Sequence, residues 1–219
     1  MTQPATLHYQ ALLLDLDGTI VDSRKGIQNC LRRAMDRLEI QHDGMDLLPY
    51  IGPPIQEIFW DITGDEALTQ LGIRYYRQAY AQSGVHENEL LPGIEEAIRE
   101  LRNMGYRLML ATSKPQKYAK IILEDFHLEE QFELIGGATL DGKVSKKIEV
   151  IQWVLQTAGL SPKDALMIGD RKFDLIGAQQ AGMDAMGILF GFGSRQELQE
   201  YPHVYLAPTA RDMVEYLRR

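Results

Sequence analysis

Apolar residues gather into short uninterrupted runs along the chain, as in strands that are buried on both faces of a sheet. Five runs fit this description, of which the last is the weakest: residues 11–14, 107–111, 165–168, 185–190 and 132–135. Between the runs, apolar residues recur at every third or fourth position, as in helices that cover a sheet. Two of these helical stripes end near Gly105 and Gly159, a residue type that often terminates helices. The alternation predicts an α/β fold with an open, mainly parallel sheet.

One long interval, residues 22–90, breaks the alternation because it contains no strand-like run. It is too long for an unstructured loop in a compact domain. Its apolar residues form three helical stripes instead. The third stripe consists of Leu68, Leu71, Tyr75, Tyr76 and Ala79. We therefore expect a small helical domain at residues 22–90, inserted after the first strand into an α/β core made of residues 1–21 and 91–219.

Composition and charge limit the possible partners. The chain has 219 residues, is 45% hydrophobic and carries a net charge of −8, which disfavours a broad nucleic-acid-binding face. Its single cysteine, Cys30, cannot form an intramolecular disulfide, which suits a reducing compartment. Residues 1–9 lack the pattern of a signal peptide, and no apolar run approaches the ~20 residues of a membrane span. We predict a cytoplasmic protein, monomeric or a small homo-oligomer, that binds neither nucleic acid nor membrane.

Candidate chemistry begins where the first strand ends. Residues 11–14 run directly into two carboxylates, Asp15 and Asp17, and then into Gly18, which permits a sharp turn. In open α/β sheets, ligands bind at the carboxyl ends of the strands. Asp15 and Asp17 are therefore well placed for chemistry, although an acidic pair alone is also common in solvated turns.

Three further segments add polar groups to the same edge of the sheet. Thr112 and Ser113 follow the second strand and precede Pro115, as at a helix N-terminus that binds an anion. Asp170 and Asp174 follow the fourth strand. Four clustered carboxylates repel one another unless a cation lies among them, and a hard, oxygen-liganded ion such as Mg²⁺ is expected. Residues 143–147 contain three lysines, one of which is placed to reach into the cleft.

Together these segments resemble the four motifs of the haloacid dehalogenase superfamily, in its phosphoglycolate phosphatase-like branch with a helical cap after the first strand. The likeness runs from about residue 10 to the end of the chain. The matching residues, in motif order, are Asp15-Leu16-Asp17-Gly18-Thr19, Thr112-Ser113-Lys114-Pro115, Lys147 with Lys146 as competitor, and Gly169-Asp170-Arg171-Lys172-Phe173-Asp174. The resemblance implies a Rossmann-like core and a magnesium-dependent phosphatase.

The same resemblance implies a role for each motif. Asp15 is the nucleophile that forms an aspartyl-phosphate, and Asp17 is the general acid and base. Thr112 and Lys147 hold the phosphoryl oxygens, with Ser113 and backbone amides near Gly18 as further candidates. Mg²⁺ is held by the Asp15 carboxylate, the Asp17 backbone carbonyl and Asp170, while Asp174 binds it directly or through water.

Other reactions on such a scaffold fit the residues less well. A dehalogenase needs neither Asp17 as proton donor nor a metal ion, and similar sugar-phosphate mutases carry a histidine where this chain has Ile27. A signalling receiver domain, which also holds an aspartyl-phosphate, needs no helical insertion.

The substrate is expected to be a small phosphorylated metabolite. We expect 2-phosphoglycolate first, then nucleoside 5′-monophosphates, then pyrophosphate or other small organophosphates. Residues 52–54, a Gly-Pro-Pro turn, are the candidate substrate-facing loop. Arg24, Lys25 and Arg74 are the candidate cations for a second anionic group.

Overall fold

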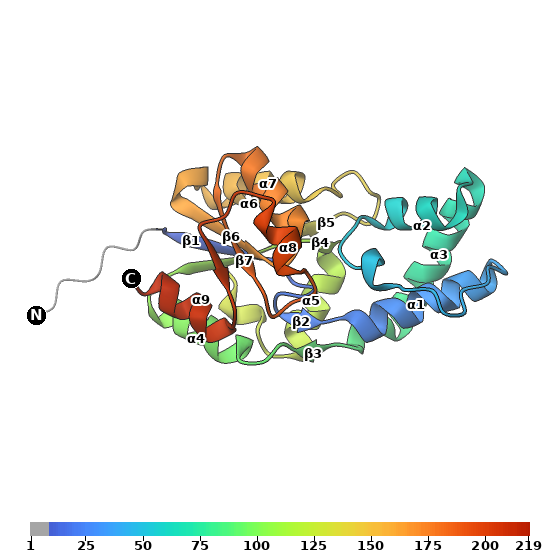
Figure 1. Ribbon diagram of the computed structural model, residues 1–219, viewed down its shortest axis with the longest axis horizontal. Coiled ribbons are helices and arrows are strands. Elements are labelled where there is room, and N and C mark those ends of the chain that lie inside the picture. Colours follow the sequence, from blue (N-terminus) through green and yellow to red (C-terminus); the bar gives the residue numbers. More distant parts are fainter. Residues whose placement is uncertain (1–8) are drawn as a thin grey trace, which may run out of the picture.

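A computed structural model describes residues 9–219, so most of the segment in which no signal peptide is expected lies outside the described residues. A six-stranded sheet in the order β5-β4-β1-β6-β7-β8 runs through the molecule, and every neighbouring pair in it is parallel (Figure 1). Its strands are β1 Ala11–Leu14, β4 Arg107–Pro115, β5 Leu134–Ala138, β6 Ala165–Gly169, β7 Asp184–Ile188 and β8 Tyr205–Ala207. The predicted α/β class with a parallel sheet is confirmed.

Helices cover both faces of this sheet. The α-helices are α1 Arg24–Arg37, α2 Ile55–Thr63, α3 Glu66–Gln82, α4 Ile94–Asn103, α5 Gln116–Asp125, α6 Lys147–Ala158, α7 Lys172–Ala181, α8 Arg195–Gln199 and α9 Ala210–Leu217. Short 3₁₀ turns are η1 Leu48–Tyr50, η2 Gly84–His86, η3 Glu129–Gln131 and η4 Pro162–Asp164. Within β1, Leu12 and Leu14 face the core shared with α4, α5 and α9, whereas Ala11 and Leu13 face α6 and α7. Burial on both faces explains why this strand is an unbroken apolar run.

The five predicted strands are all present. The run with the weakest apolar pattern corresponds to β5, at the edge of the sheet. Strand β8, at the opposite edge, was not predicted, because three residues give too little pattern to separate a strand from a loop. The last predicted strand also ends earlier than expected, at Ile188 rather than residue 190.

Residues 22–90 form α1, α2 and α3, which group beside the sheet rather than over either of its faces (Figure 1). The expectation that this segment contains no strand is wrong in detail. Val21–Asp22 (β2) and Glu89–Leu90 (β3) form a two-stranded antiparallel ribbon where the chain leaves the sheet and where it returns. The division into a core and a cap domain stays a prediction.

The apolar stripe expected on α3 is also partly wrong. Leu68 is 41% exposed, whereas Gly72, Ile73 and Tyr80 are buried. A Cβ atom at Gly72 would collide with the ring of Phe59 on α2, so the close packing of α2 on α3 selects this face. Helical spacing identifies a helix, but it does not say which side meets a neighbour.

Two smaller expectations concern single features of the chain. The Cys30 side chain is fully buried among the core residues, and no disulfide forms. Among the described residues, no helix combines the length and the apolar character that a membrane span requires.

Candidate active site

Strand order brings the predicted site residues together. Strands β4, β1 and β6 are adjacent in the sheet, so the segments that follow them meet at one edge. Asp15 follows β1, Thr112 lies in the last part of β4, and Asp170 follows β6. Residues far apart in the sequence therefore converge because parallel strands point the same way.

The turn after β1 depends on Gly18. Its φ of +78° lies in the left-handed region, and a Cβ atom there would collide with the carboxylate of Asp170 and the ring of Phe192. The Gly18 N–H donates to the Val21 carbonyl oxygen at 2.8 Å. This amide is therefore already engaged within the turn, which argues against the predicted phosphate contact at Gly18. The residue instead gives Asp170 space to approach the turn.

Three carboxylates form a tight group behind this turn. Oxygens of Asp15, Asp170 and Asp174 lie within 4.8 Å of one another, and Asp170 and Asp174 are fully buried. Burial, followed by the charges of Asp174 and Asp15, raises the pKa of Asp170 well above its usual range. Burial likewise raises the pKa of Asp174 to about 6, although Lys147 lowers it in part. The raised pKa values indicate that nearby positive charge does not fully balance these three carboxylates.

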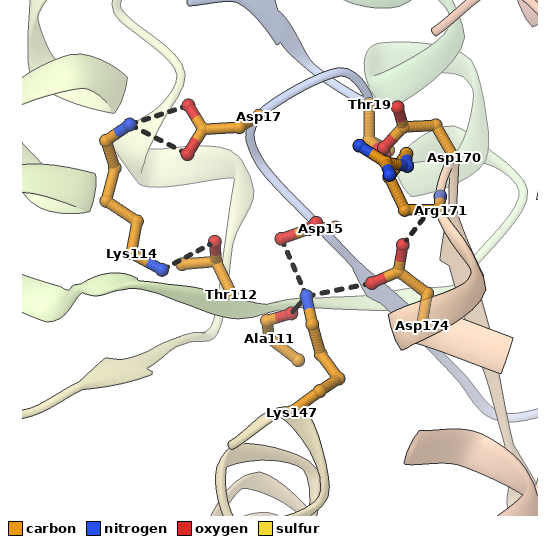
Figure 2. A network of polar contacts seen from close by, with 10 residues as sticks. All are labelled: Asp15, Asp17, Thr19, Ala111, Thr112, Lys114, Lys147, Asp170, Arg171 and Asp174. Atoms are coloured by element: carbon orange, nitrogen blue, oxygen red, sulfur yellow. Dashed lines mark hydrogen bonds and ion pairs between the residues drawn. The ribbon is translucent and has the colours of Figure 1, made fainter. Parts of the chain in front are cut away.

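Lys147, the first residue of α6, supplies part of that charge (Figure 2). Its Nζ lies 2.8 Å from Asp15 Oδ1 and 2.8 Å from Asp174 Oδ1, and it donates to the Ala111 carbonyl oxygen at 2.9 Å. Burial lowers the pKa of Lys147, but the two carboxylates raise it by more, so the ammonium stays charged. Lys146, the competing candidate, is exposed to solvent. The geometry favours Lys147 as the lysine of the site.

A second lysine, which the sequence analysis did not select as a site residue, holds Asp17. The Nζ of Lys114 lies 2.6 Å from Oδ1 and 2.7 Å from Oδ2 of Asp17 (Figure 2). The Lys114 N–H also donates to Thr112 Oγ1 at 3.2 Å. The period of two in a strand offered a signal, because it places residues 112 and 114 on one side.

The donor set suits a divalent cation. Asp15, Asp17, Asp170 and Asp174 carry four carboxylates, against which Lys114 and Lys147 set two ammonium groups. Asp170 is bound by the Phe192 N–H at 2.7 Å and by the Thr19 hydroxyl at 3.4 Å, neither of which carries a charge. A hard divalent ion at Asp15, Asp170 and Asp174 would balance the remaining charge with oxygen ligands. The Asp17 carboxylate lies outside this group.

Magnesium is expected to stabilise the protein more at pH 7.5 than at pH 5. Without metal, the raised pKa values mean that the folded state binds protons on Asp170 and Asp174 more tightly than the unfolded state. Their contribution to stability is therefore favourable at low pH. It is lost for Asp174 as pH rises from about 4 through 6, and for Asp170 as pH rises through its own raised pKa. Saturating Mg²⁺ removes this penalty at pH 7.5 and should raise Tm by about 5–10 °C. Protons compete with the ion at pH 5, so the gain should shrink there.

Differential scanning calorimetry with Mg²⁺ and with chelator, at both pH values, measures this effect. The variant Asp170→Asn serves as the control, because it should lose most of the gain at pH 7.5. Equal gains at both pH values would contradict binding at these buried carboxylates.

A pocket opens above the carboxylates, between the sheet edge and the helical segment. Asp15, Asp17, Thr112 and Ser113 line its floor. Its walls are largely aromatic and aliphatic: Ile27, Tyr50, Pro53, Pro54, Ile55, Ile58, Tyr76, Tyr80 and Tyr118. The Gly-Pro-Pro turn therefore does face the pocket, as expected.

The cations that line the pocket, Arg77 and Lys114, are not among the three candidates expected for a second anionic group. Arg77 of α3 lines the pocket. Arg24 and Lys25 lie instead along a separate groove, where Arg24 pairs with Asp22, and Arg74 is exposed one turn before Arg77. None of the three lines the pocket, so the expectation is wrong. Arg24 and Lys25 lie at the start of α1 along the separate groove, and the side of α3 that meets the pocket was not evident from the sequence.

A family model described as haloacid dehalogenase-like hydrolase matches residues 12–188. The chain belongs to the haloacid dehalogenase-like hydrolase family. The match covers β1 to β7, the helical segment and all four motifs. The expected resemblance is confirmed, and so is the expected class of enzyme, a phosphatase of this family.

Individual relatives of this haloacid dehalogenase-like hydrolase carry different names. A 5′-nucleotidase of Pseudomonas aeruginosa is 38% identical over 94% of this chain and 95% of its own length. The tyrosine-protein kinase PtkA of Mycobacterium tuberculosis is 35% identical over 84% of this chain and 63% of its own. A crystal structure of a predicted phosphatase from Clostridium acetobutylicum is 35% identical, with a TM-score of 0.91 over 96% of this chain and 98% of its own.

Proposed function

We propose that this haloacid dehalogenase-like hydrolase is a Mg²⁺-dependent phosphatase of small phosphate monoesters, with Asp15 as its nucleophile. One observation carries the proposal. The Asp15 carboxylate is held by Lys147 at 2.8 Å beside two fully buried carboxylates, and it lines the floor of a pocket. A carboxylate in this position can attack a phosphoryl group, whereas a carboxylate with a purely structural role would have no reason to line a pocket.

The reaction has two steps. An oxygen of Asp15 attacks phosphorus, the bond from phosphorus to the ester oxygen breaks, and protonated Asp17 gives its proton to the leaving alkoxide. Asp17 then takes a proton from water, and the resulting hydroxide attacks the phosphorus of the aspartyl-phosphate. Inorganic phosphate leaves and the carboxylate of Asp15 is restored. Asp15 and Asp17 both line the pocket, so a bound ester can reach both.

The remaining site residues stabilise charge in this scheme. Lys147 and Thr112 lie beside Asp15 and bind phosphoryl oxygens, and Ser113 is a further donor. Mg²⁺ held by Asp15, Asp170 and Asp174 would offset the repulsion between the carboxylates and the anionic ester. Residues 22–90, as a cap domain over the pocket, exclude bulk water from it.

The pocket wall bears on the leaving group. Tyr50 and Tyr76 are partly exposed and line the pocket, and aromatic surface of this kind suits a flat and uncharged group such as a nucleoside. A nucleoside 5′-monophosphate is therefore our first candidate, in agreement with the name of the Pseudomonas relative. 2-Phosphoglycolate is the second candidate, since Arg77 in the wall can pair with a carboxylate.

A panel of esters tests this proposal. Phosphate release is measured for nucleoside 5′-monophosphates, 2-phosphoglycolate and pyrophosphate, with Mg²⁺ and with chelator. We expect Mg²⁺-dependent release, with kcat/KM at least about tenfold higher for a nucleotide than for 2-phosphoglycolate. The variant Arg77→Gln is the matched test of the second candidate, because it should weaken 2-phosphoglycolate alone. Transfer of phosphate from ATP to a tyrosine peptide, without release from any ester, would instead favour the activity named for the mycobacterial relative.

The cytoplasmic location and the state of association, monomer or small homo-oligomer, stay predictions.

A further inference from the structure

Lys114 occupies a position that the proposed reaction leaves unexplained. Of the two lysines, Lys147 contacts the nucleophile Asp15 and the buried Asp174, whereas Lys114 makes its ion pair with Asp17. The Lys114 side chain is 5% exposed, and both oxygens of Asp17 lie within 2.7 Å of its ammonium. Burial of an ammonium group is costly. A buried lysine with one ionic partner therefore indicates a role for that ion pair.

Irregular pairing of β4 with β5 fixes where this ammonium lies. The register between the two strands shifts between Thr112 and Pro115, and the Lys114 N–H bonds to the Thr112 hydroxyl within that stretch. A bulged strand re-aims its side chains, and such irregularities are common beside active sites. The same irregularity therefore determines the position of Thr112 on the pocket floor and of the backbone from which the Lys114 side chain extends.

An aromatic wall limits how far the ammonium can move. Its Nζ lies 5.0 Å from the centre of the Tyr80 ring on α3, close enough for a cation–π contact. Tyr80 in turn meets the edge of Tyr118 on α5 at 5.2 Å and stacks with Tyr76 at 5.6 Å. Lys114 therefore lies between Asp17 on the sheet side and a ring of the helical segment on the other.

We propose that Lys114 is the positioning residue for Asp17. By binding both oxygens of the ionised carboxylate and resting against Tyr80, it prevents the Asp17 side chain from rotating and keeps it at the leaving-group side of the pocket, in the form that takes a proton from water. The inference rests on the proposed role of Asp17 as general acid and base. It adds that this role depends on Lys114, and that packing of α3 over the site helps to set the geometry of Asp17.

Kinetics of Lys114 variants test the proposal. We expect Lys114→Met to lower kcat by about 10- to 100-fold while KM changes by less than about threefold, because general acid–base catalysis is worth about 10²–10⁴-fold. Lys114→Arg should retain activity within about fivefold, since a guanidinium also binds both oxygens of a carboxylate. Lys120→Met, an exposed lysine on α5, is the matched control and should behave as the wild type.

A double-mutant cycle separates this role from a general structural one. If Lys114 acts through Asp17, then Lys114→Met added to Asp17→Asn should cost less than about threefold more. The same loss in both backgrounds, or a raised KM with unchanged kcat, would overturn the inference. If Lys114→Met proves too unstable to assay, Lys114→Arg decides the matter, because a folded arginine variant as slow as Asp17→Asn contradicts the proposal.

Failure of the inference can be told apart from failure of the proposed function. Wild-type protein that releases no phosphate would overturn the proposed function and the inference with it. Asp17→Asn protein with full activity would overturn the acid–base role of Asp17, and with it the inference, but not the phosphatase activity itself. A slow Asp17→Asn variant beside an unaffected Lys114→Met variant would overturn the inference alone.

Discussion

Replacing Asp15 by asparagine is expected to lower kcat by about 10⁴-fold or more, because an amide cannot replace a carboxylate as nucleophile toward phosphorus. Stability should change little, by about 1 kcal/mol or less, since the two side chains have nearly the same shape and the Asp15 side chain is partly exposed. The variant loses its ion pair with Lys147, but it also loses repulsion from Asp174. Phosphate release and urea denaturation measure the two effects.

The exposed residue Asp43 provides a matched control for this change. Asp43→Asn makes the same chemical replacement outside the pocket, and its kcat and its unfolding free energy should equal those of the wild type. Turnover by Asp15→Asn near the wild-type rate would contradict the role of Asp15 as nucleophile. Incubation with substrate followed by acid quenching adds an independent measurement, because the wild type alone should carry phosphate on the protein.

Replacing Lys147 by methionine is expected to lower the unfolding free energy by about 3–5 kcal/mol in the absence of Mg²⁺, because two largely buried carboxylates lose their cationic partner. The Lys147 ammonium lies 2.8 Å from both Asp15 and Asp174, and no other ammonium contacts them among the described residues. Activity should fall along with stability, since the same ammonium is proposed to bind the phosphoryl group. Urea denaturation in chelator gives the free energy.

The neighbouring residue Lys146 provides a matched control for the Lys147→Met variant. Lys146 is exposed, and its backbone N–H rather than its side chain bonds to Glu149. Lys146→Met should therefore change the unfolding free energy by no more than about 0.5 kcal/mol. If Lys146→Met were the more damaging of the two changes, Lys147 would not be the lysine of the site.

Strands were predictable from the sequence where burial on both faces makes every residue apolar, and they were missed where it does not. Strands β1 and β6 are covered on both faces, so every position in them is apolar and each run stands out. Strand β8 lies at the sheet edge with three residues, and Tyr205 within it is half-buried, so no such run arises. The pairing of β2 with β3 was equally hidden, because two-residue strands have no periodicity.

The candidate site shows the same division. Asp15, Asp17, Asp170 and Asp174 could be selected because carboxylates at the carboxyl ends of parallel strands converge. Which cations face them depends on tertiary placement. The contact of Lys114 with Asp17 depends on the irregular pairing of β4, and the presence of Arg77 rather than Arg74 in the pocket depends on which side of α3 meets the pocket. The two-residue spacing of Thr112 and Lys114 hints at a shared side, but it does not reveal the bulge, and nothing in composition or spacing separates Arg77 from Arg74.

The β2–β3 ribbon has a consequence for how the substrate specificity of such enzymes can be altered. It sets Asp22 opposite Glu89 and Val21 opposite Leu90, so the chain departs and returns at adjacent points. The inserted segment between β2 and β3 can therefore vary in length at little entropic cost of loop closure, since the hydrogen bonds of the ribbon already hold its two ends together. A chimera that keeps the ribbon and exchanges the residues between its two strands should therefore retain the carboxylates and lysines proposed as the catalytic site. The part of the pocket wall that residues 22–90 contribute would be new, and so would the residue that replaces Tyr80 beside Lys114.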